Sequence, residues 1–175
     1  MASDGITLLL LLLVVVLVRQ YIGMPVCIKG NSMLSTLHSG EITLVSRLAL
    51  HREGIQRGDV VICQYPGRYW GKGKLIRQNF VKRVVGLPGE TVEIIEGIVY
   101  IEGEPLNEPY LDAAHNRRKA NMMAHVLGED EYFVLGDNRD SSNDSRRVGA
   151  IHQNEIVGVV TRVVWPLHAM RSIRP

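Results

Sequence analysis

The sequence predicts a mainly β protein, with folded-over, barrel-like antiparallel sheets following an N-terminal transmembrane helix. Three observations predict this fold class: short runs rich in β-branched and aromatic residues recur along the chain, Gly and Pro separate them, and one unbroken apolar run stands near the N-terminus. At 175 residues the chain can form one globular domain with an appendage. We therefore expect an anchor over residues 1–20 and a β-rich domain over residues 21–175.

The apolar run covers residues 6–18 and consists of Leu, Val, Ile and one Thr. As a helix it would span about 20 Å, less than the roughly 30 Å hydrocarbon core of a bilayer. A secretory signal is the alternative, but Arg19, Gln20 and Tyr21 follow in place of a small-x-small cleavage site. A core helix would need a polar face, which the run lacks. We expect a membrane anchor, extended by Tyr21 and Ile22 at the interface or shortened by a misassigned start.

Beyond the anchor, seven short runs have the composition of strands. They cover residues 42–45, 60–65, 81–85, 91–95, 98–101, 132–135 and 156–164. Glu96-Gly97 stands between two of them and predicts a tight hairpin turn, and residues 56–59 predict another turn. The stretch 110–128 is polar, so we expect a loop or small insertion at about 105–130.

The composition and charge of the chain limit the classes of molecule that it can be expected to bind. Charged residues are 22% and apolar ones 46%, as in folded domains, and a formal charge of +2 without a dense basic stripe argues against nucleic acid. Arg171 and Arg174 are candidates for contact with anionic lipid headgroups. The histidines are scattered, so we expect neither a metal site nor a cofactor. Cys27 and Cys63 lack metal-like spacing and stand in apolar stretches, so buried thiols are expected, with a disulfide as the alternative.

Residues 30–37, Gly-Asn-Ser-Met-Leu-Ser-Thr-Leu, place Ser32 among small and polar neighbours, with Met33 and Leu37 as apolar anchors. Gly30 can adopt backbone conformations closed to other residues, which suits a sharp turn that presents a side chain. By itself this pattern is typical of a strand-to-helix turn capped by Ser32.

A lysine stands in an apolar strand further along the chain. Strand alternation puts Lys82 on one face with Phe80 and Val84, and Arg83 on the other. The ordinary interpretation is an edge-strand lysine that opposes aggregation. The chemical interpretation is a base for a serine hydroxyl, which needs a lysine pKa lowered to about 7–8 by burial. His38 is near Ser32 in sequence but lacks an Asp partner.

A dense polar loop at residues 136–146 contains three Asp, two Asn, three Ser and two Arg. This loop lacks the residue pattern of an EF-hand calcium loop. The ordinary interpretation of such a polar stretch is a solvated turn.

Together, the stretches 30–37, 82–90 and 136–146 resemble, in order and spacing, the nucleophile box, the general-base box and the third box of bacterial type I signal peptidases. The similarity runs from the apolar segment to Trp165-Pro166-Leu167. The resemblance implies a membrane-bound serine endopeptidase that removes signal peptides from exported preproteins, cleaving after small residues in an Ala-x-Ala pattern. It also implies a single-pass plasma-membrane protein with its catalytic domain outside the cytoplasm, although Arg19 and Lys29 after the run favour the opposite orientation.

The resemblance also implies roles for individual residues. Ser32 is the expected nucleophile and Lys82 the expected general base. Ser142 is expected to hydrogen-bond and orient the lysine amine. Asp144 and Arg146 are expected to pair and to hold the third box against the site.

Two positions depart from the family pattern. Gly30 stands where some family members have a serine that donates to the oxyanion, which leaves the Ser32 backbone N–H as the first donor. Ser35 stands where proline is usual, which loosens the turn after the nucleophile. Met33 and Val84 are expected as walls of shallow substrate pockets. The expected partners are exported preproteins and membrane lipid.

Two alternatives stay open. Self-cleaving SOS-type repressors share the serine–lysine arrangement on a similar β fold, but they are cytosolic with a DNA-binding head, and the apolar run at 6–18 counts against them. A membrane-anchored β-domain whose boxes have decayed is the non-enzymatic alternative, with Ser35 as a sign of drift.

Overall fold

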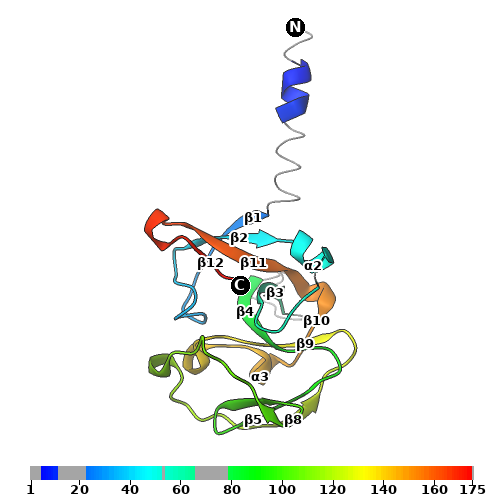
Figure 1. Ribbon diagram of the computed structural model, residues 1–175, viewed down its shortest axis with the longest axis vertical. Coiled ribbons are helices and arrows are strands. Elements are labelled where there is room, and N and C mark those ends of the chain that lie inside the picture. Colours follow the sequence, from blue (N-terminus) through cyan, green and yellow to red (C-terminus); the bar gives the residue numbers. More distant parts are fainter. Residues whose placement is uncertain (1–4, 12–22, 53, 66–78, 175) are drawn as a thin grey trace, which may run out of the picture.

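The computed structural model describes residues 5–11, 23–52, 54–65 and 79–174. The strands of this part of the chain form two antiparallel sheets (Figure 1). The mainly β prediction is therefore confirmed. The larger sheet is open, because its strand order begins at β1 and ends at β10, so the described residues do not form a closed barrel.

The larger sheet has the strand order β1-β2-β11-β3-β4-β9-β10, with β12 also paired to β11. Its strands are β1 (Met24–Cys27), β2 (Ile42–Ser46), β3 (Val60–Gln64), β4 (Asn79–Gly86), β9 (Glu131–Leu135), β10 (Ile151–His152), β11 (Ile156–Trp165) and β12 (Arg171–Ser172). The short helices around it are α2 (Leu48–Arg52), α3 (Ser145–Val148), η2 (Arg139–Ser141), η3 (Gln153–Glu155) and η4 (Leu167–Ala169).

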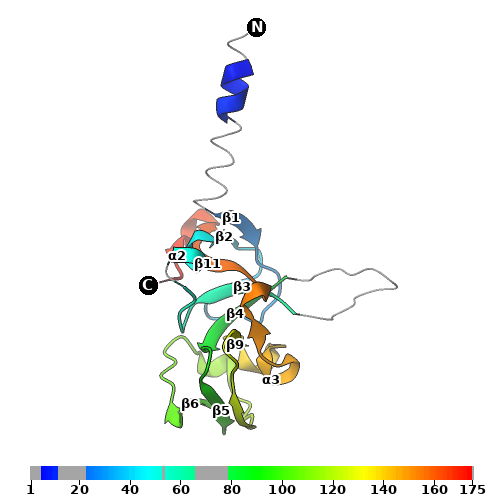
Figure 2. The same ribbon diagram turned by 90° about the vertical axis from the view of Figure 1, so that its right-hand side faces the viewer.

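The smaller sheet has the order β7-β6-β5-β8 and lies at the end of the molecule opposite β1 and β2 (Figures 1 and 2). Its strands are β5 (Thr91–Ile95), β6 (Ile98–Ile101), β7 (Glu104–Pro105) and β8 (Met122–Val126), and η1 (Ala113–His115) precedes β8. Ile95 pairs with Ile98, which confirms the tight turn at Glu96-Gly97. Within the stretch predicted to be a loop or small insertion, residues 122–126 form β8, where Met122 packs on the apolar core of this sheet.

The core explains why β3 is an apolar run without alternation. Val61 and Cys63 pack into one cluster, whereas Val60 and Ile62 pack into another. A strand covered on both faces has no reason to carry outward polar side chains. This strand pairs with β4, so it fixes the position of Lys82 opposite Val61.

The two cysteines differ from each other. Cys63 is fully buried, as expected, and burial raises the pKa of its thiol to about 12. Cys27 is exposed, which corrects the expectation of two buried thiols, because it lies at the end of the edge strand β1. Both are free thiols.

The proposed anchor lies mostly outside the described residues. Residues 5–11 are helical and exposed. Of the helices that the structure describes, none combines the length and the apolar character needed to cross a membrane.

Candidate active site

The turn that carries Ser32 is held by its own apolar side chains. Met33 and Leu37 are buried in one core cluster, as expected for anchors, and Ser32, directly before Met33, is half-buried. The N–H of Leu37 donates to the Met33 carbonyl at 2.7 Å, which closes a single helical turn. Gly30 enters this turn with φ of +93°, a conformation that strongly favours glycine.

Lys82 reaches this turn from β4. Its Nζ lies 2.8 Å from Ser32 Oγ and donates to the Val81 carbonyl at the same distance. The residue is only 2% exposed, and its Nζ lies 5.9 Å from the centroid of the Phe80 ring. Phe80 and Val84 pack into one core cluster and Val81 into another, so the predicted alternation along this strand is confirmed.

Burial makes the Lys82 amine easier to deprotonate. Desolvation lowers the pKa of Lys82, and the nearby charge of Arg146 lowers it further. Cys63, Asp144 and Asp137 oppose this shift, but the net direction is downward. A neutral amine beside a serine hydroxyl can accept the hydroxyl proton, which a charged ammonium cannot do.

The third box lies directly against the Ser32 turn. The Asn138 side chain donates to the Asn31 carbonyl at 3.0 Å, and the Asn138 N–H donates to the Ser32 carbonyl at 3.1 Å. Gly136 permits this approach, because a Cβ there would collide with Ser142 and with the Ser32 carbonyl. The loop at 136–146 is thus part of the site and not a solvated turn.

Asp144 and Arg146 form the expected pair. Arg146 Nε donates to Asp144 Oδ1 and Arg146 Nη2 to Asp144 Oδ2, both at 2.8 Å. The Asp144 carboxylate also accepts the Gly136 N–H at 3.1 Å, and Arg146 Nη2 donates to the Arg139 carbonyl at 2.9 Å. These bonds tie both ends of the loop together.

Ser142 does not make the expected bond to Lys82. Its Oγ is buried and has no hydrogen-bond partner among the residues that the structure describes. The amine donates instead to Val81 and lies against Ser32. Met33 and Val84 are also corrected: at 2% and 0% exposure they belong to the core and offer no surface to a peptide.

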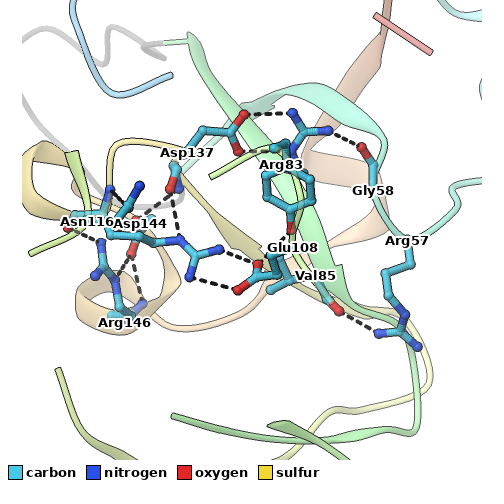
Figure 3. A network of polar contacts seen from close by, with 12 residues as sticks. Arg57, Gly58, Arg83, Val85, Glu108, Asn116, Asp137, Asp144 and Arg146 are labelled. Atoms are coloured by element: carbon cyan, nitrogen blue, oxygen red, sulfur yellow. Dashed lines mark hydrogen bonds and ion pairs between the residues drawn. The ribbon is translucent and has the colours of Figure 1, made fainter. Parts of the chain in front are cut away.

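Sequence reasoning missed a second buried ion pair, which lies beside the pair formed by Ser32 and Lys82, here called the dyad. Arg83 Nε donates to Asp137 Oδ1 at 2.9 Å, and Arg83 Nη2 donates to Asp137 Oδ2 at 2.7 Å (Figure 3). Thr36 Oγ1 donates to Asp137 and accepts from Arg83. The available signal was a second cation in an apolar strand, since a buried guanidinium requires an anion.

The C-terminal segment also contacts the turn that carries Ser32. Arg171 Nη2 donates to the Thr36 carbonyl at 2.6 Å, and its Nη1 donates to Glu41 Oε1 at 2.8 Å. Arg174 Nε lies 2.9 Å from Asp59 Oδ1. Both arginines therefore pair within the protein, and their contact with lipid headgroups stays a prediction.

No group of metal-ligating side chains occurs in the part of the chain that the structure covers. The reactive groups that the structure brings into contact are the Ser32 hydroxyl and the buried Lys82 amine. A β fold that brings these two groups together defines the class of serine–lysine hydrolases.

Comparison with known proteins identifies the family. The family described as Signal peptidase, peptidase S26 matches residues 2–165, so the chain belongs to it. The chain is 36% identical to Signal peptidase I of Bacillus amyloliquefaciens, over 97% of this chain and 88% of that protein. It is 37% identical to Probable signal peptidase I-1 of Synechocystis sp., over 89% of this chain and 79% of that protein. A crystal structure of a signal peptidase I from Enterococcus faecalis is 35% identical, covers 61% of this chain and 97% of its own, and has a TM-score of 0.48.

Proposed function

We propose that the protein is a membrane-bound serine endopeptidase that removes signal peptides from exported preproteins, with Ser32 as nucleophile and Lys82 as general base. The observation that carries this proposal is the 2.8 Å contact between the Ser32 hydroxyl and a lysine amine that is 2% exposed. Membership of the signal peptidase family supports the substrate class.

The two groups divide the reaction between them. Neutral Lys82 takes the hydroxyl proton while Ser32 Oγ forms a bond to the scissile carbonyl carbon. The Ser32 backbone N–H is the proposed donor to the resulting oxyanion. The Lys82 ammonium then gives its proton to the leaving amine as the peptide bond breaks, which leaves an acyl-enzyme on Ser32. Water, deprotonated by Lys82, hydrolyses this ester and restores the serine.

The supporting residues act on the geometry of this pair. Asp144 and Arg146 hold the third box against the Ser32 turn, and Ser142 is proposed to orient the amine once substrate is bound. Its buried hydroxyl has no hydrogen-bond partner among the described residues, which supports this role, because an unsatisfied group has a donor and an acceptor to offer. With Gly30 in place of a serine, a second oxyanion donor has to be backbone or water.

The open edge of β1 supports an extended mode of substrate binding. This strand ends the larger sheet and stops at Cys27, five positions before Ser32. A preprotein segment could add to such an edge through main-chain hydrogen bonds, and small pockets would then select the side chains at alternate positions. We propose cleavage after small residues, with alanine favoured one and three residues before the bond.

A fluorogenic peptide tests the activity. The full chain in detergent micelles should cleave a peptide with the Ala-x-Ala pattern, and should spare a matched peptide in which the last alanine is replaced by phenylalanine. The Ser32→Ala variant is the matched enzyme control and should cleave neither. Absence of cleavage by the wild-type chain would favour the decayed β-domain.

We also propose that residues 1–20 form a single-pass membrane anchor. Residues 21–175 then form the catalytic domain, with a small insertion at about 105–130. This domain is proposed to face outward from the plasma membrane and to touch lipid. Trp165, Leu167 and Met170 support contact with lipid, since they are exposed together around η4, and tryptophan favours membrane interfaces. After alkaline carbonate extraction of cells, the full chain should remain with the membranes. Recovery in the soluble fraction would favour the cytosolic self-cleaving alternative.

A further inference from the structure

One segment that belongs to none of the three boxes contacts all of them. Residues 108–118, the connecting segment, lie between β7 and β8. The Ser35 hydroxyl of the first box donates to the Tyr110 carbonyl at 3.1 Å. Arg83 of the second box lies against the Tyr110 ring, and the Arg139 N–H of the third box donates to Asn116 Oδ1 at 2.9 Å.

Tyr110 covers one face of the Arg83 guanidinium. The Arg83 Cζ lies 4.0 Å from the centroid of the tyrosine ring, the distance of a stacked cation–π contact. The edges of the same guanidinium are occupied by the Asp137 carboxylate, by Thr36 Oγ1 at 3.0 Å and by the Gly58 carbonyl at 2.7 Å. The contacts in the plane of the guanidinium fix its orientation, and the Tyr110 ring shields one face of the ion pair between Arg83 and Asp137.

The tyrosine hydroxyl is anchored as well. It donates to Glu108 Oε1 at 2.6 Å, and burial together with the Glu108 charge raises the pKa of the phenol, so it remains a donor. Glu108 forms an ion pair with Arg139, and both side chains are buried. Asp140 accepts the N–H groups of Arg117 and Arg118 at 3.0 and 2.9 Å.

We propose that the connecting segment sets the mutual position of the three boxes, and that Tyr110 is a positioning residue that acts on Lys82 through Arg83. The proposal rests on the proposed function, because it concerns the same serine–lysine pair. Arg83 follows Lys82 directly in β4, so a shift of its guanidinium moves the backbone that carries the amine. The segment thereby controls the geometry of the dyad without touching substrate.

Removal of the ring has a predictable effect on the base. The charged and titratable groups that face Lys82 are Cys63, Asp137, Asp144 and Arg146. Without Tyr110, water reaches the pair between Arg83 and Asp137 and loosens it, so the Asp137 charge is less well compensated. Added hydration and the freer carboxylate both favour the ammonium form and raise the pKa of Lys82. Less of the base is then neutral at a given pH.

The experiment compares kcat, KM and the pH profile of kcat/KM for Tyr110→Leu and Tyr110→Phe, with the Ala-x-Ala peptide as substrate and the full chain in micelles. We expect Tyr110→Leu to lower kcat by about tenfold with KM within about twofold, and to move the acid limb to higher pH. Tyr110→Phe keeps the stacked ring and should retain the wild-type limb. Tyr100→Leu is the matched control, because this tyrosine lies on β6 of the smaller sheet, and it should resemble wild type throughout.

Ser35→Ala keeps the test open if Tyr110→Leu does not fold. Ser35 is exposed, and its replacement removes only the hydrogen bond to Tyr110, so a smaller shift of the acid limb in the same direction is expected. Wild-type kcat and an unmoved limb in Tyr110→Leu would overturn the proposal, as would lost stability without a change of the limb. Failure of the wild-type chain to cleave would instead refute the proposed function.

Discussion

Asp144→Asn probes how far the third box depends on one carboxylate. Asp144 is fully buried and accepts hydrogen bonds from Arg146 Nε, Arg146 Nη2 and the Gly136 N–H. Asparagine has nearly the same shape, but its amide turns an NH2 group toward one of these donors and leaves the Arg146 charge uncompensated. Loss of one partner of a buried pair costs about 3–5 kcal/mol. For a chain of this size that corresponds to a fall in Tm of about 6–20 °C.

Thermal unfolding of the full chain in micelles, followed by circular dichroism, measures this loss, and the peptide assay measures the activity that accompanies it. Asp130→Asn is the matched control, since Asp130 pairs with His152 on the surface and its side chain is 62% exposed. The control should change stability by less than about 1 kcal/mol. An Asp144→Asn variant with unchanged Tm and unchanged activity would refute the conclusion that this pair holds the third box.

Further variants test the dyad and its turn. Ser32→Ala should fold normally and retain less than about a thousandth of the wild-type rate, and faster cleavage would exclude Ser32 as the nucleophile. Lys82→Arg should be inactive in the peptide assay, because arginine cannot release its proton, whereas an active variant would overturn the dyad. The pKa of Lys82 is lower in the folded chain than in the unfolded chain, where it is about 10.4. At pH values between these two pKa values, the unfolded chain carries a proton on Lys82 that the folded chain lacks. The free energy of unfolding of the wild type should therefore rise with pH in that window. Unfolding at several pH values should show Lys82→Met more stable than wild type at neutral pH, with the difference shrinking as pH rises, and a constant difference would contradict a neutral lysine. Ser35→Pro should destabilise the fold by more than about 1 kcal/mol in denaturant titration, because Ser35 has φ of +80° and proline cannot adopt it, and a stabilised variant would show a different turn.

The sequence predicts best where composition and burial agree. Strands such as β5 and β6 are found at their predicted residues because β-branched runs end at unambiguous turns. The alternation of Phe80, Lys82 and Val84 followed from strand geometry alone, and the structure agrees with it. The pairing of Asp144 with Arg146 was also expected, and it is present.

The remainder depends on tertiary contacts that no local pattern shows. β8 reads Met-Met-Ala-His-Val and is mostly exposed, so its pairing with β5 and not its composition makes it a strand. Cys27 is exposed only because β1 lies at a sheet edge. Glu108 contacts Arg139, 31 positions further along the chain, and Tyr110 contacts Arg83, 27 positions earlier. Polar residues in a connecting stretch give no sign of such partners.

The bond between Arg171 and the Thr36 carbonyl joins residues 135 positions apart in the sequence. During synthesis, the turn that carries Ser32 therefore emerges long before the residue that closes it. Contacts of such long range form late, since the intervening chain must first be ordered. The turn that carries Ser32 therefore stays without this bond until Arg171 has been synthesised and has packed against it.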